Sequence, residues 1–503
     1  MEKKKKKFLM PDTYIIIFFV VLFAAILTYV VPQGYFQTKE VSYMVGDVEK
    51  TKTVIVDDSF QYVKDDNGNP VKKGVKLFAA DGETNGFLNY MFEGLVTGDK
   101  ESSAVGIIAF LLVIGGAFGI VLSTGSVEHG ISRMIKRMKG KEFLIIPVLF
   151  ILFSLGGAVF GMGEEAIPFV LIVVPMTVAM GYDAIVGIMI TYCATQIGFA
   201  TSWMNPFSVA VAQGISGVPV MSGAMFRIVM WIVFNIVGIV FTLFYAKKIK
   251  KNPELSVSYK SDSFYRKDMG QSEASDVKFG LGDTLIILDI LLTLVWVIWG
   301  VVKKGYYIPQ IATQFFTMGL IAALIGIVFK LNDLDVNKIA AAFRNGAKDL
   351  LTAALVIGMA QGIILVLGGT NPSEGTVLNT LLYKTSNLIG GLPEALSAWI
   401  MYIFQSIFNF FVVSGSGQAA LTMPLMAPLA DLTGVTRQTA VLAFQLGDGL
   451  TNLIVPTSGL LIAVLGAARM DWNTWAKFQI KFQTILFILA SVFILIAVAI
   501  GFN

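Results

Sequence analysis

The chain has 503 residues, of which 55% are hydrophobic and 14% charged. Its mean hydropathy of +0.73 excludes an ordinary soluble domain. The single cysteine, Cys193, cannot form an internal disulfide, and the single histidine, His129, cannot build a multi-histidine metal site. The net charge of +4 is small and does not indicate a nucleic-acid-binding surface. We therefore expect a polytopic membrane protein with no cofactor, no metal and no nucleic-acid partner.

The N-terminal region combines lysines at positions 3–7 with an apolar stretch at 15–31. A cleaved signal peptide is one reading, but the stretch is longer than a typical h-region of about 7–15 residues and ends without a clean small-residue cleavage site. We interpret residues 1–32 as a transmembrane helix with a cytoplasmic N-terminus, because basic residues stay on the cytoplasmic side. Residues 33–101 are polar, with a strand-like patch at 53–56 and a turn signal near Asn67-Gly68, and predict a small external polar insertion with β-structure.

Further apolar stretches are long enough to cross a bilayer. With the first helix they predict about nine crossings and an external C-terminus, and most basic clusters then fall in cytoplasmic loops. The polar stretch 251–280 is interpreted as a cytoplasmic linker between two membrane repeats, 102–250 and 281–503. The predicted spans are 104–123, 184–215, 223–246, 284–302, 310–329, 349–369, 437–466 and 476–501.

Two other apolar stretches, 143–181 and 394–432, are each interrupted by a glycine-rich polar cluster and are interpreted as re-entrant helical hairpins, which add no crossing. Each is followed by a helix with a polar break, 184–215 and 437–466. An odd number of crossings separates the hairpins, which predicts an inverted repeat, an arrangement typical of secondary transporters with a site at the repeat interface. Chance punctuation by glycine and proline is the alternative. The matching features are Gly161-Met162-Gly163-Glu164 with Gly415-Ser416-Gly417-Gln418, Pro175 with Pro428, Gly181 with Gly434, Gln196-Ile197-Gly198 with Gln445-Leu446-Gly447, and Asn205 to Ser208 with Asn452 and Pro456 to Ser458.

Three carboxylates lie inside these apolar stretches. Glu164 and Glu165 are the only charged residues in 143–181, and Asp448 is the only one in 438–468. A charge at membrane depth costs at least about 2.5–3.5 kcal/mol on insertion scales and usually faces a cavity, a pathway or a partner. The neighbouring backbone breaks leave carbonyls and helix N-termini free to bind ions or anionic groups.

We expect four polar segments, two hairpin tips and two helix breaks, to converge on a substrate and ion site. The alternative is structural: hydroxyl groups at 201, 202, 414 and 416 could cap or back-bond their own helices, the two glutamates could lie in a water-exposed loop, and the aspartate could make a structural hydrogen bond across the repeat. Gly115 with Gly119, and Gly358 with Gly362, predict close helix packing. The candidate site residues are Gly163, Glu164, Glu165, Thr201, Ser202, Asn205, Ser208, Ser414, Ser416, Gln418, Asp448, Thr451, Asn452, Thr457 and Ser458.

The motifs resemble a known family. The string from Gly157 to Phe169, the triplet Asn205-Pro206-Phe207, the tip Ser414 to Ala419 and Gly447-Asp448-Gly449 are similar to the YfcC-type carriers of the anaerobic C4-dicarboxylate carrier (DcuC) family, within the ion transporter superfamily. The resemblance covers nearly the whole chain, with residues 33–101 matching least. It implies a homodimer with a scaffold and a moving transport domain, an elevator-like mechanism, and a site built from the two tips and the two breaks.

The solute is less well defined. The family name suggests dicarboxylates, whereas relatives are associated with arginine and ornithine exchange or with peptide-like and aromatic-acid substrates. The residues offer Glu164, Glu165 and Asp448 but no arginine or lysine at the same depth, and like charges repel strongly in a low dielectric. A cationic or zwitterionic amino compound fits better, with its carboxylate on a hairpin-tip N-terminus and its cationic group near these acids. Helix N-termini, neutral Ser and Asn groups and co-bound cations leave an organic anion open, and coupling to Na⁺, to H⁺ or by obligate exchange is equally compatible.

Other classes fit less well. Asp183 and Asp448 suggest an intramembrane aspartyl protease, but the glycine that should precede Gly447-Asp448 by two positions is absent, and a catalytic dyad must share a proton. No phosphate-binding loop for a primary pump occurs. A channel remains an alternative, since hairpins with polar tips also line pores. We expect a multi-pass secondary transporter, not an enzyme, in a bacterial inner membrane.

Overall fold

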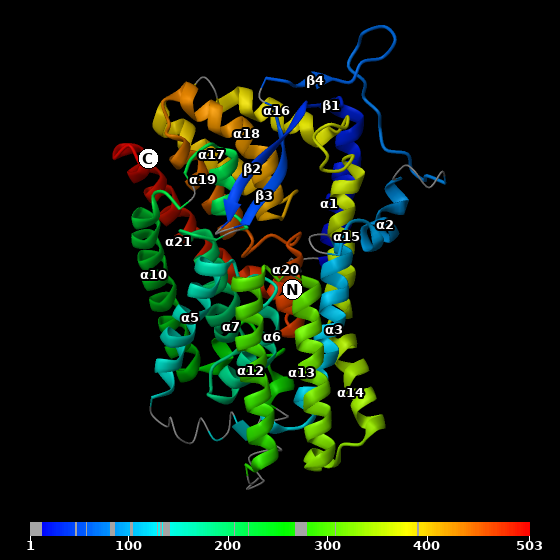
Figure 1. The fold of residues 1–503 in the computed structure, drawn as a ribbon, viewed down its shortest axis with the longest axis vertical. Coiled ribbons are helices and arrows are strands. Elements are labelled where there is room, and N and C mark those ends of the chain that lie inside the picture. Colours follow the sequence, from blue (N-terminus) through cyan, green and yellow to red (C-terminus); the bar gives the residue numbers. More distant parts are fainter. Residues whose placement is uncertain are drawn as a thin grey trace, which may run out of the picture.

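The computed structural model describes residues 13–45, 48–56, 58–80, 86–100, 104–127, 129–130, 133, 141–205, 207–219, 221–266, 279–306, 308–389 and 392–503. These residues form a mostly helical body (Figure 1). Seven helices in this part of the chain are long and apolar enough to cross a membrane. Large apolar side chains such as Phe244 (72% exposed) and Leu324 (65% exposed) project from them, as expected for surfaces in contact with lipid. The fold is that of an all-α polytopic membrane protein, and the number of crossings stays a prediction.

The N-terminal helix α1, Thr13–Val30, packs against α15, Leu351–Val366. Its residues Ile17, Val21 and Ala24 recur every three or four positions and are fully buried, which is the pattern of a helix with one face against the protein. The helix is therefore an integral part of the body.

The polar insertion contains two antiparallel strand pairs. Strand β1, Gly34–Tyr35, pairs with β4, Gln61–Tyr62, and β2, Thr38–Val45, pairs with β3, Val48–Ile55, so the expected β-structure is present. Two short helices follow, η1 at Phe87–Asn89 and α2 at Tyr90–Val96. Phe60 stacks on Tyr383 with ring centroids 4.0 Å apart, and this contact holds the insertion against the second half of the chain.

The first membrane half contains one interrupted hairpin and one broken helix. Helices α5 and α6 are the arms of the hairpin. The broken helix consists of α7, the π-helical turn η3, α8 and, after the break, α9. The bounds are α3 Ala104–Ser123, η2 Glu142–Leu144, α5 Ile145–Phe160, α6 Ala166–Ala179, α7 Ala184–Ile188, η3 Met189–Cys193, α8 Ala194–Ala200, α9 Val209–Ile215, α10 Ala224–Lys251 and η4 Pro253–Leu255.

The second half repeats this order, with α17 and α18 as hairpin arms and α19 and α20 on the two sides of the second break. The bounds are α12 Leu281–Lys304, α13 Ile308–Val328, η5 Leu331–Asp333, α14 Val336–Asp349, α15 Leu351–Val366, α16 Val377–Ile389, α17 Glu394–Phe408, α18 Gly415–Thr433, α19 Arg437–Thr451, α20 Gly459–Ala467 and α21 Trp472–Ala499.

The two halves contact each other reciprocally. Helix α9, after the first break, packs on hairpin arm α18 of the second half, and α20, after the second break, packs on arm α6 of the first half. Figure 1 shows α5 and α6 in the lower part of the molecule and α17 and α18 in the upper part. The two hairpins thus lie toward opposite ends of this view, and the inverted repeat stays a prediction. Their placement relative to a membrane stays a prediction.

Helix α14 differs from the sequence expectation. Its basic residues, among them Lys338 and Arg344, were expected in a cytoplasmic loop, whereas they lie in a helix that begins where the Asp335 carboxylate accepts the backbone N–H of Lys338 at 2.8 Å. The sequence analysis missed this helix because charged residues cover its exposed face. Its other face carries small residues that pack on α3.

Glycines bring α3 and α14 into close contact. A methyl group on Gly346 would overlap the carbonyl oxygen of Gly115, and one on Gly119 would overlap that of Ala342. Gly358 and Gly362 of α15 likewise lie against α2, where an added methyl group would overlap Leu95 and Tyr90. The predicted packing role of both glycine pairs is confirmed.

Candidate functional site

The two hairpin tips and the two helix breaks lie next to one another. Ser202, in the first break, donates a hydrogen bond to a carbonyl in the last turn of α5. Thr457, in the second break, donates to a carbonyl of the second tip at 2.8 Å. The halves are joined where the Tyr192 hydroxyl donates to the Asn452 carbonyl at 2.8 Å. The structure therefore brings together the four segments that the sequence singled out.

The first tip places one carboxylate inside the protein. Helix α5 ends at Gly161, whose φ of 73° is left-handed and suits glycine. The Glu165 carboxylate then accepts the Gly163 N–H at 2.8 Å. Glu165 is only 7% exposed, and Glu164 is half-buried. The alternative of a water-exposed loop is therefore wrong for Glu165.

The first break contains both satisfied and unsatisfied polar groups. Thr201 donates to the carbonyl one turn back at 2.7 Å, which is the structural back-bonding considered above. Ser202 Oγ accepts the N–H of Asn205 at 2.8 Å, and Asn205 Oδ1 accepts the N–H of Phe207 at 2.8 Å. Asn205 Nδ2 and Ser208 Oγ are buried without a hydrogen-bond partner among the described residues. Pro206 lies outside those residues.

The second tip begins α18. Ser414 caps this helix by accepting the N–H of Gly417 at 3.3 Å, so the capping alternative is confirmed for Ser414. Ser416 is half-buried at the tip. Gln418 is buried and donates to Gln405 Oε1 of the neighbouring arm at 2.7 Å, while its own side-chain oxygen has no partner in the described part of the chain.

Asp448 is enclosed and its carboxylate is unpaired. The residue is 0% exposed, and neither carboxyl oxygen has a hydrogen-bond partner among the described residues. A methyl group on Gly415 would lie 3.1 Å from Asp448 Oδ2, so the carboxylate faces the first residue of α18. Its backbone carbonyl accepts from Asn409 Nδ2 at 3.1 Å and from the N–H of Asn452 at 3.3 Å. Among the described residues no hydrogen bond from the other half reaches this carboxylate, so the alternative of a structural bond across the repeat finds no support there.

The second break is held mainly by amide and hydroxyl groups. Asn452 Oδ1 accepts from Asn409 Nδ2 at 2.8 Å. Ser458 caps α20 by accepting the N–H of Leu461 at 3.2 Å, and Thr451 is half-buried beside it. Capping therefore accounts for Ser458, while Thr451 and Asn452 are half-buried at the break.

Both hairpin tips already present a carboxylate to a helix N-terminus. Glu165 precedes the first residue of α6, and Asp448 faces the first residue of α18. A helix N-terminus attracts negative charge, and at each tip a carboxyl group of the protein itself lies close to one. Where a solute carboxylate would bind stays a prediction.

Four uncharged residues at these contacts were missed or undervalued by the sequence analysis. Gln405, in the last turn of α17, and Asn409, which directly follows this helix, bond to the second tip and the second break. Gln196 and Gln445, noted only as a repeat match, contact the breaks as well. The repeat match singled out Gln196 and Gln445 in the sequence. Gln405 and Asn409 carried no such signal, because neutral amides in an apolar helix are not unusual.

A buried arginine lies one side chain away from the first break. Arg227, in the first turn of α10, is 0% exposed and donates from Nε to Gln445 Oε1 at 3.0 Å and from Nη2 to Gln438 Oε1 at 2.9 Å. Gln445 in turn donates to the Ser202 carbonyl at 2.6 Å. The sequence argument left this cation out because it sits at the end of an apolar stretch, where basic residues usually mark the membrane surface.

The chain matches known proteins over its full length. The profile of the C4-dicarboxylate anaerobic carrier family, DcuC, matches residues 10–499. An Escherichia coli (strain K12) protein, provisionally named basic amino acid antiporter YfcC, is 50% identical over 502 residues, which cover 100% of this chain and 99% of that protein. A Haemophilus influenzae (strain Rd) protein without an assigned function is 30% identical over 520 residues, covering 99% of each chain.

Two solved structures are also similar. The YdaH transporter of Alcanivorax borkumensis has a TM-score of 0.39 at 15% identity and covers 98% of this chain and 99% of its own. MtrF of Neisseria gonorrhoeae, described with a class of antimetabolite efflux pumps, has a TM-score of 0.41 at 15% identity and covers 98% of this chain and 96% of its own. Both TM-scores are below 0.5, so neither structure supports an assignment of site or function to this chain.

The family match and the 50% identity agree with the motifs at the two tips and the two breaks. The chain is therefore a multi-pass membrane transporter and not an enzyme, and it belongs to the C4-dicarboxylate anaerobic carrier (DcuC) family.

Proposed function

We propose that the chain exchanges a small cationic or zwitterionic amino-acid-like solute, of the arginine or ornithine type, across a bacterial inner membrane. The observation that carries this proposal is the placement of the acids. Glu165 directly precedes the first residue of α6, Asp448 of α19 faces the first residue of α18, and Glu164 is half-buried at the first tip. A guanidinium or ammonium group is the natural partner of such carboxylates.

The provisional name of the E. coli relative, a basic amino acid antiporter, supports the same class of solute at 50% identity. The half-buried members of the site, Glu164, Ser416, Thr451 and Asn452, are the ones that a solute would reach first. The enclosed members, above all Asp448, suit the transfer of a proton or a small cation. Coupling to H⁺ or Na⁺ and obligate exchange are the three forms of this proposal.

The proposed mechanism is elevator-like. In this mechanism the hairpins and broken helices move as one body past a scaffold, in a homodimer whose N-termini are cytoplasmic and whose C-termini are external. The contacts of α9 with α18 and of α20 with α6 support the movement of both halves together, because each hairpin arm is packed against the broken helix of the other half.

A second candidate is an organic-anion carrier. The family description names C4-dicarboxylates, and Arg227 is a buried cation for which the described residues provide no carboxylate within ion-pair distance. A buried charge without a counter-charge is costly, and a dicarboxylate could supply it. The three neutral groups that already bond Arg227 make this reading the weaker of the two.

The two remaining alternatives are remote. Asp183 caps the start of α7, whereas Asp448 lies at the tips beyond the far end of α8, about 25 Å away at 1.5 Å per residue. A protease dyad therefore cannot form. A channel is distinguished from a carrier by saturable exchange, which the test below measures.

Counterflow in proteoliposomes tests the solute class. Vesicles are preloaded in separate batches with arginine, ornithine, a neutral amino acid, a dipeptide or succinate, at two pH values and with or without Na⁺. Accelerated, saturable uptake of labelled arginine or ornithine is the expected result. Exchange of succinate alone would replace the proposal with the anion carrier, and non-saturable flux would indicate a channel.

A further inference from the structure

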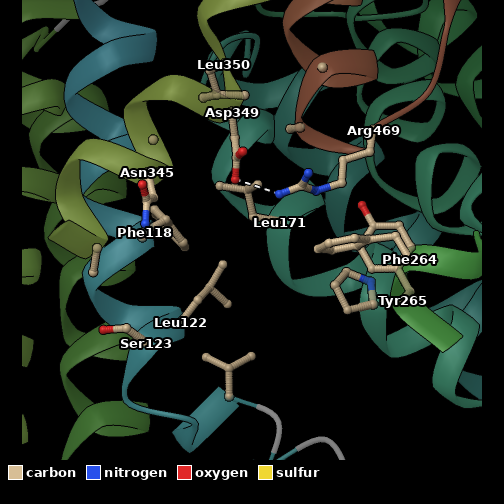
Figure 2. Close-up of a pocket in the computed structure, with 18 of the residues that line it drawn as sticks. Phe118, Leu122, Ser123, Leu171, Phe264, Tyr265, Asn345, Asp349, Leu350 and Arg469 are labelled. Carbon is tan, nitrogen blue, oxygen red and sulfur yellow. Dashed lines mark hydrogen bonds and ion pairs between the residues drawn. The ribbon is translucent and has the colours of Figure 1, made fainter. Parts of the chain in front are cut away.

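A cavity of about 520 Å³ lies apart from the hairpin tips, between α3, α6, α14 and the end of α20 (Figure 2). Leu171, Pro175 and Ala179 line it from α6 at a spacing of four residues, so they form one face of that helix. Leu171 follows the first residue of α6 by five positions, about 7.5 Å of helix axis. The cavity therefore leads along α6 from the linker side of the protein toward the first hairpin tip.

An arginine side chain of the protein itself projects into this cavity. Arg469, just after α20, places Nη2 2.6 Å from Asp349 Oδ2 and its guanidinium carbon 4.0 Å from the centroid of the Phe264 ring. Figure 2 shows the guanidinium between these two groups, with Tyr265 beside Phe264. The backbone of Arg469 has a φ of 50°, a left-handed conformation that costs a non-glycine residue roughly 1–2 kcal/mol.

A carboxylate and an aromatic face together form a binding site for a guanidinium group. Lys338, the other basic residue of the lining, donates to the Asp333 carbonyl at 2.7 Å. The ion pair between Arg469 and Asp349 is open to water, since the two side chains are 40% and 46% exposed. Exposed pairs contribute only about 0–1 kcal/mol, so an incoming cation can displace Arg469 at little cost.

We propose that this cavity is a second binding site for the cationic group of the solute. Asp349 and Phe264 hold the guanidinium or ammonium of the solute, and the Arg469 guanidinium lies between them when the solute is absent. The solute class rests on the proposed function. The site itself rests on the cavity and on the guanidinium already seated in it. Its position gives a cationic solute a binding step on the linker side before or after it reaches the tips.

Protection of a single cysteine tests this site. The variant combines Cys193→Ala with Asn345→Cys, which places an exposed thiol in the cavity wall, and the rate of labelling by a thiol reagent is measured in the purified protein. Arginine is expected to slow labelling in a saturable manner, whereas citrulline, its neutral analogue, is not. Arg469→Ala should lower the arginine concentration that gives half-maximal protection by about two- to fivefold. This factor corresponds to the free energy of an exposed ion pair, which the arginine no longer has to break.

Asp349→Asn should abolish the protection. The matched control is Asp431→Asn, which breaks an ion pair of the same kind, Arg437 Nη2 to Asp431 Oδ2 at 2.7 Å, away from the cavity, and should leave the protection unchanged. Protection that survives Asp349→Asn, protection by glutamate in place of arginine, or no protection in any variant would overturn the proposal.

The same labelling in a Glu165→Gln, Asp448→Asn background separates this inference from the proposed function. Persistent protection by arginine in that background is expected, because the cavity does not include the tips. If wild-type vesicles fail to exchange arginine while Asn345→Cys is still protected, the proposed function is wrong and the second site stands. If the vesicles exchange arginine but Asn345→Cys is not protected, the proposed function stands and the second site is wrong. If protection is lost only when Glu165→Gln and Asp448→Asn are added, the cavity is not a separate site.

Discussion

At the scale of residues, the acids were predictable and their surroundings were not. Glu164, Glu165 and Asp448 could be singled out because each is a charge within an otherwise apolar stretch. The structure adds the difference among them: Glu165 and Asp448 are enclosed, and Glu164 remains accessible. The accessible acid is therefore the one expected to contact the solute directly.

Glu164→Gln should raise the KM for arginine and leave that for a neutral amino acid unchanged. A hydrogen bond to a charged group contributes about 1.5–3 kcal/mol, so the expected rise is roughly 10- to 100-fold. The measurement is initial-rate uptake in proteoliposomes as a function of concentration. An unchanged KM for arginine would remove Glu164 from the solute site.

The control for this substitution is Asp289→Asn. Asp289 is also a buried carboxylate in a membrane helix, with one oxygen unpartnered among the described residues, but it lies in α12 and takes no part in the tips or breaks. Its substitution should leave the KM for arginine as it is in the wild type.

The uncharged partners could not be predicted from the sequence. Asn409 bridges the Asp448 carbonyl and the Asn452 side chain, and this role depends on how α17 packs against α19. Arg227 was missed for a related reason: its burial depends on Gln438 and Gln445, about 210 positions later in the chain. Contacts between distant elements are set by tertiary packing, and a single sequence does not show that packing.

At the scale of elements, glycine spacing controls how α3 and α14 pack. Gly346→Ala should lower the melting temperature, because its methyl group would overlap the Gly115 carbonyl, and overpacking costs about 1–3 kcal/mol. Thermal unfolding of the detergent-solubilised protein measures the effect. Ala340→Val, which adds volume on the exposed side of α14, is the control, and equal melting temperatures for the two variants would contradict the close contact.

The linker after α10 is attached through buried carboxylates. Asp262 accepts from Ser258 Oγ at 2.8 Å and from the N–H of Ala184 at 3.3 Å. Asp183 accepts from Tyr245 and Ser256, both at 2.6 Å. Burial raises the pKa of Asp262 from 3.8 to about 6, with a further contribution from the nearby Asp183 charge, against which Arg266 acts weakly. Burial also raises the pKa of Asp183.

The attachment of this linker should strengthen as the pH falls through 6. A raised pKa means that the folded state binds the proton more tightly than the unfolded state, so stability increases from above pH 6 down to about pH 4 and then levels off. Hydrogen–deuterium exchange in residues 256–266, corrected for intrinsic rates, should be severalfold slower at pH 5.5 than at pH 7.5. Asp262→Asn should reduce this difference, and faster corrected exchange at the lower pH would contradict the account.

At the scale of the whole molecule, the hydropathy and the repeated motifs predicted a polytopic helical protein with two hairpins and two broken helices. Those signals are strong because a lipid environment demands long apolar helices and allows breaks only where other groups satisfy the backbone. Helices α14 and α16 were not predicted, since amphipathic segments between spans look like loops when hydropathy alone is used.

The inverted arrangement predicts that the outer ends of the two hairpins face opposite sides of the membrane. In a Cys193→Ala background, Lys141→Cys precedes α5 and Glu394→Cys begins α17, and both positions are exposed. A membrane-impermeant thiol reagent applied to intact cells should label Glu394→Cys, and should label Lys141→Cys only after permeabilisation. Labelling of both from the same side would remove the inverted repeat.

The central claim is that the acids at the tips and the second break together support exchange of a cationic solute, with Glu164 contacting the solute and Asp448 enclosed beside the site. Counterflow of labelled arginine by the wild type, Asp448→Asn and Asp289→Asn, each inserted at equal amounts, tests it most directly. The account predicts exchange by the wild type and by Asp289→Asn and none by Asp448→Asn. Equal exchange by all three proteins, or exchange of succinate but not arginine by the wild type, would contradict it.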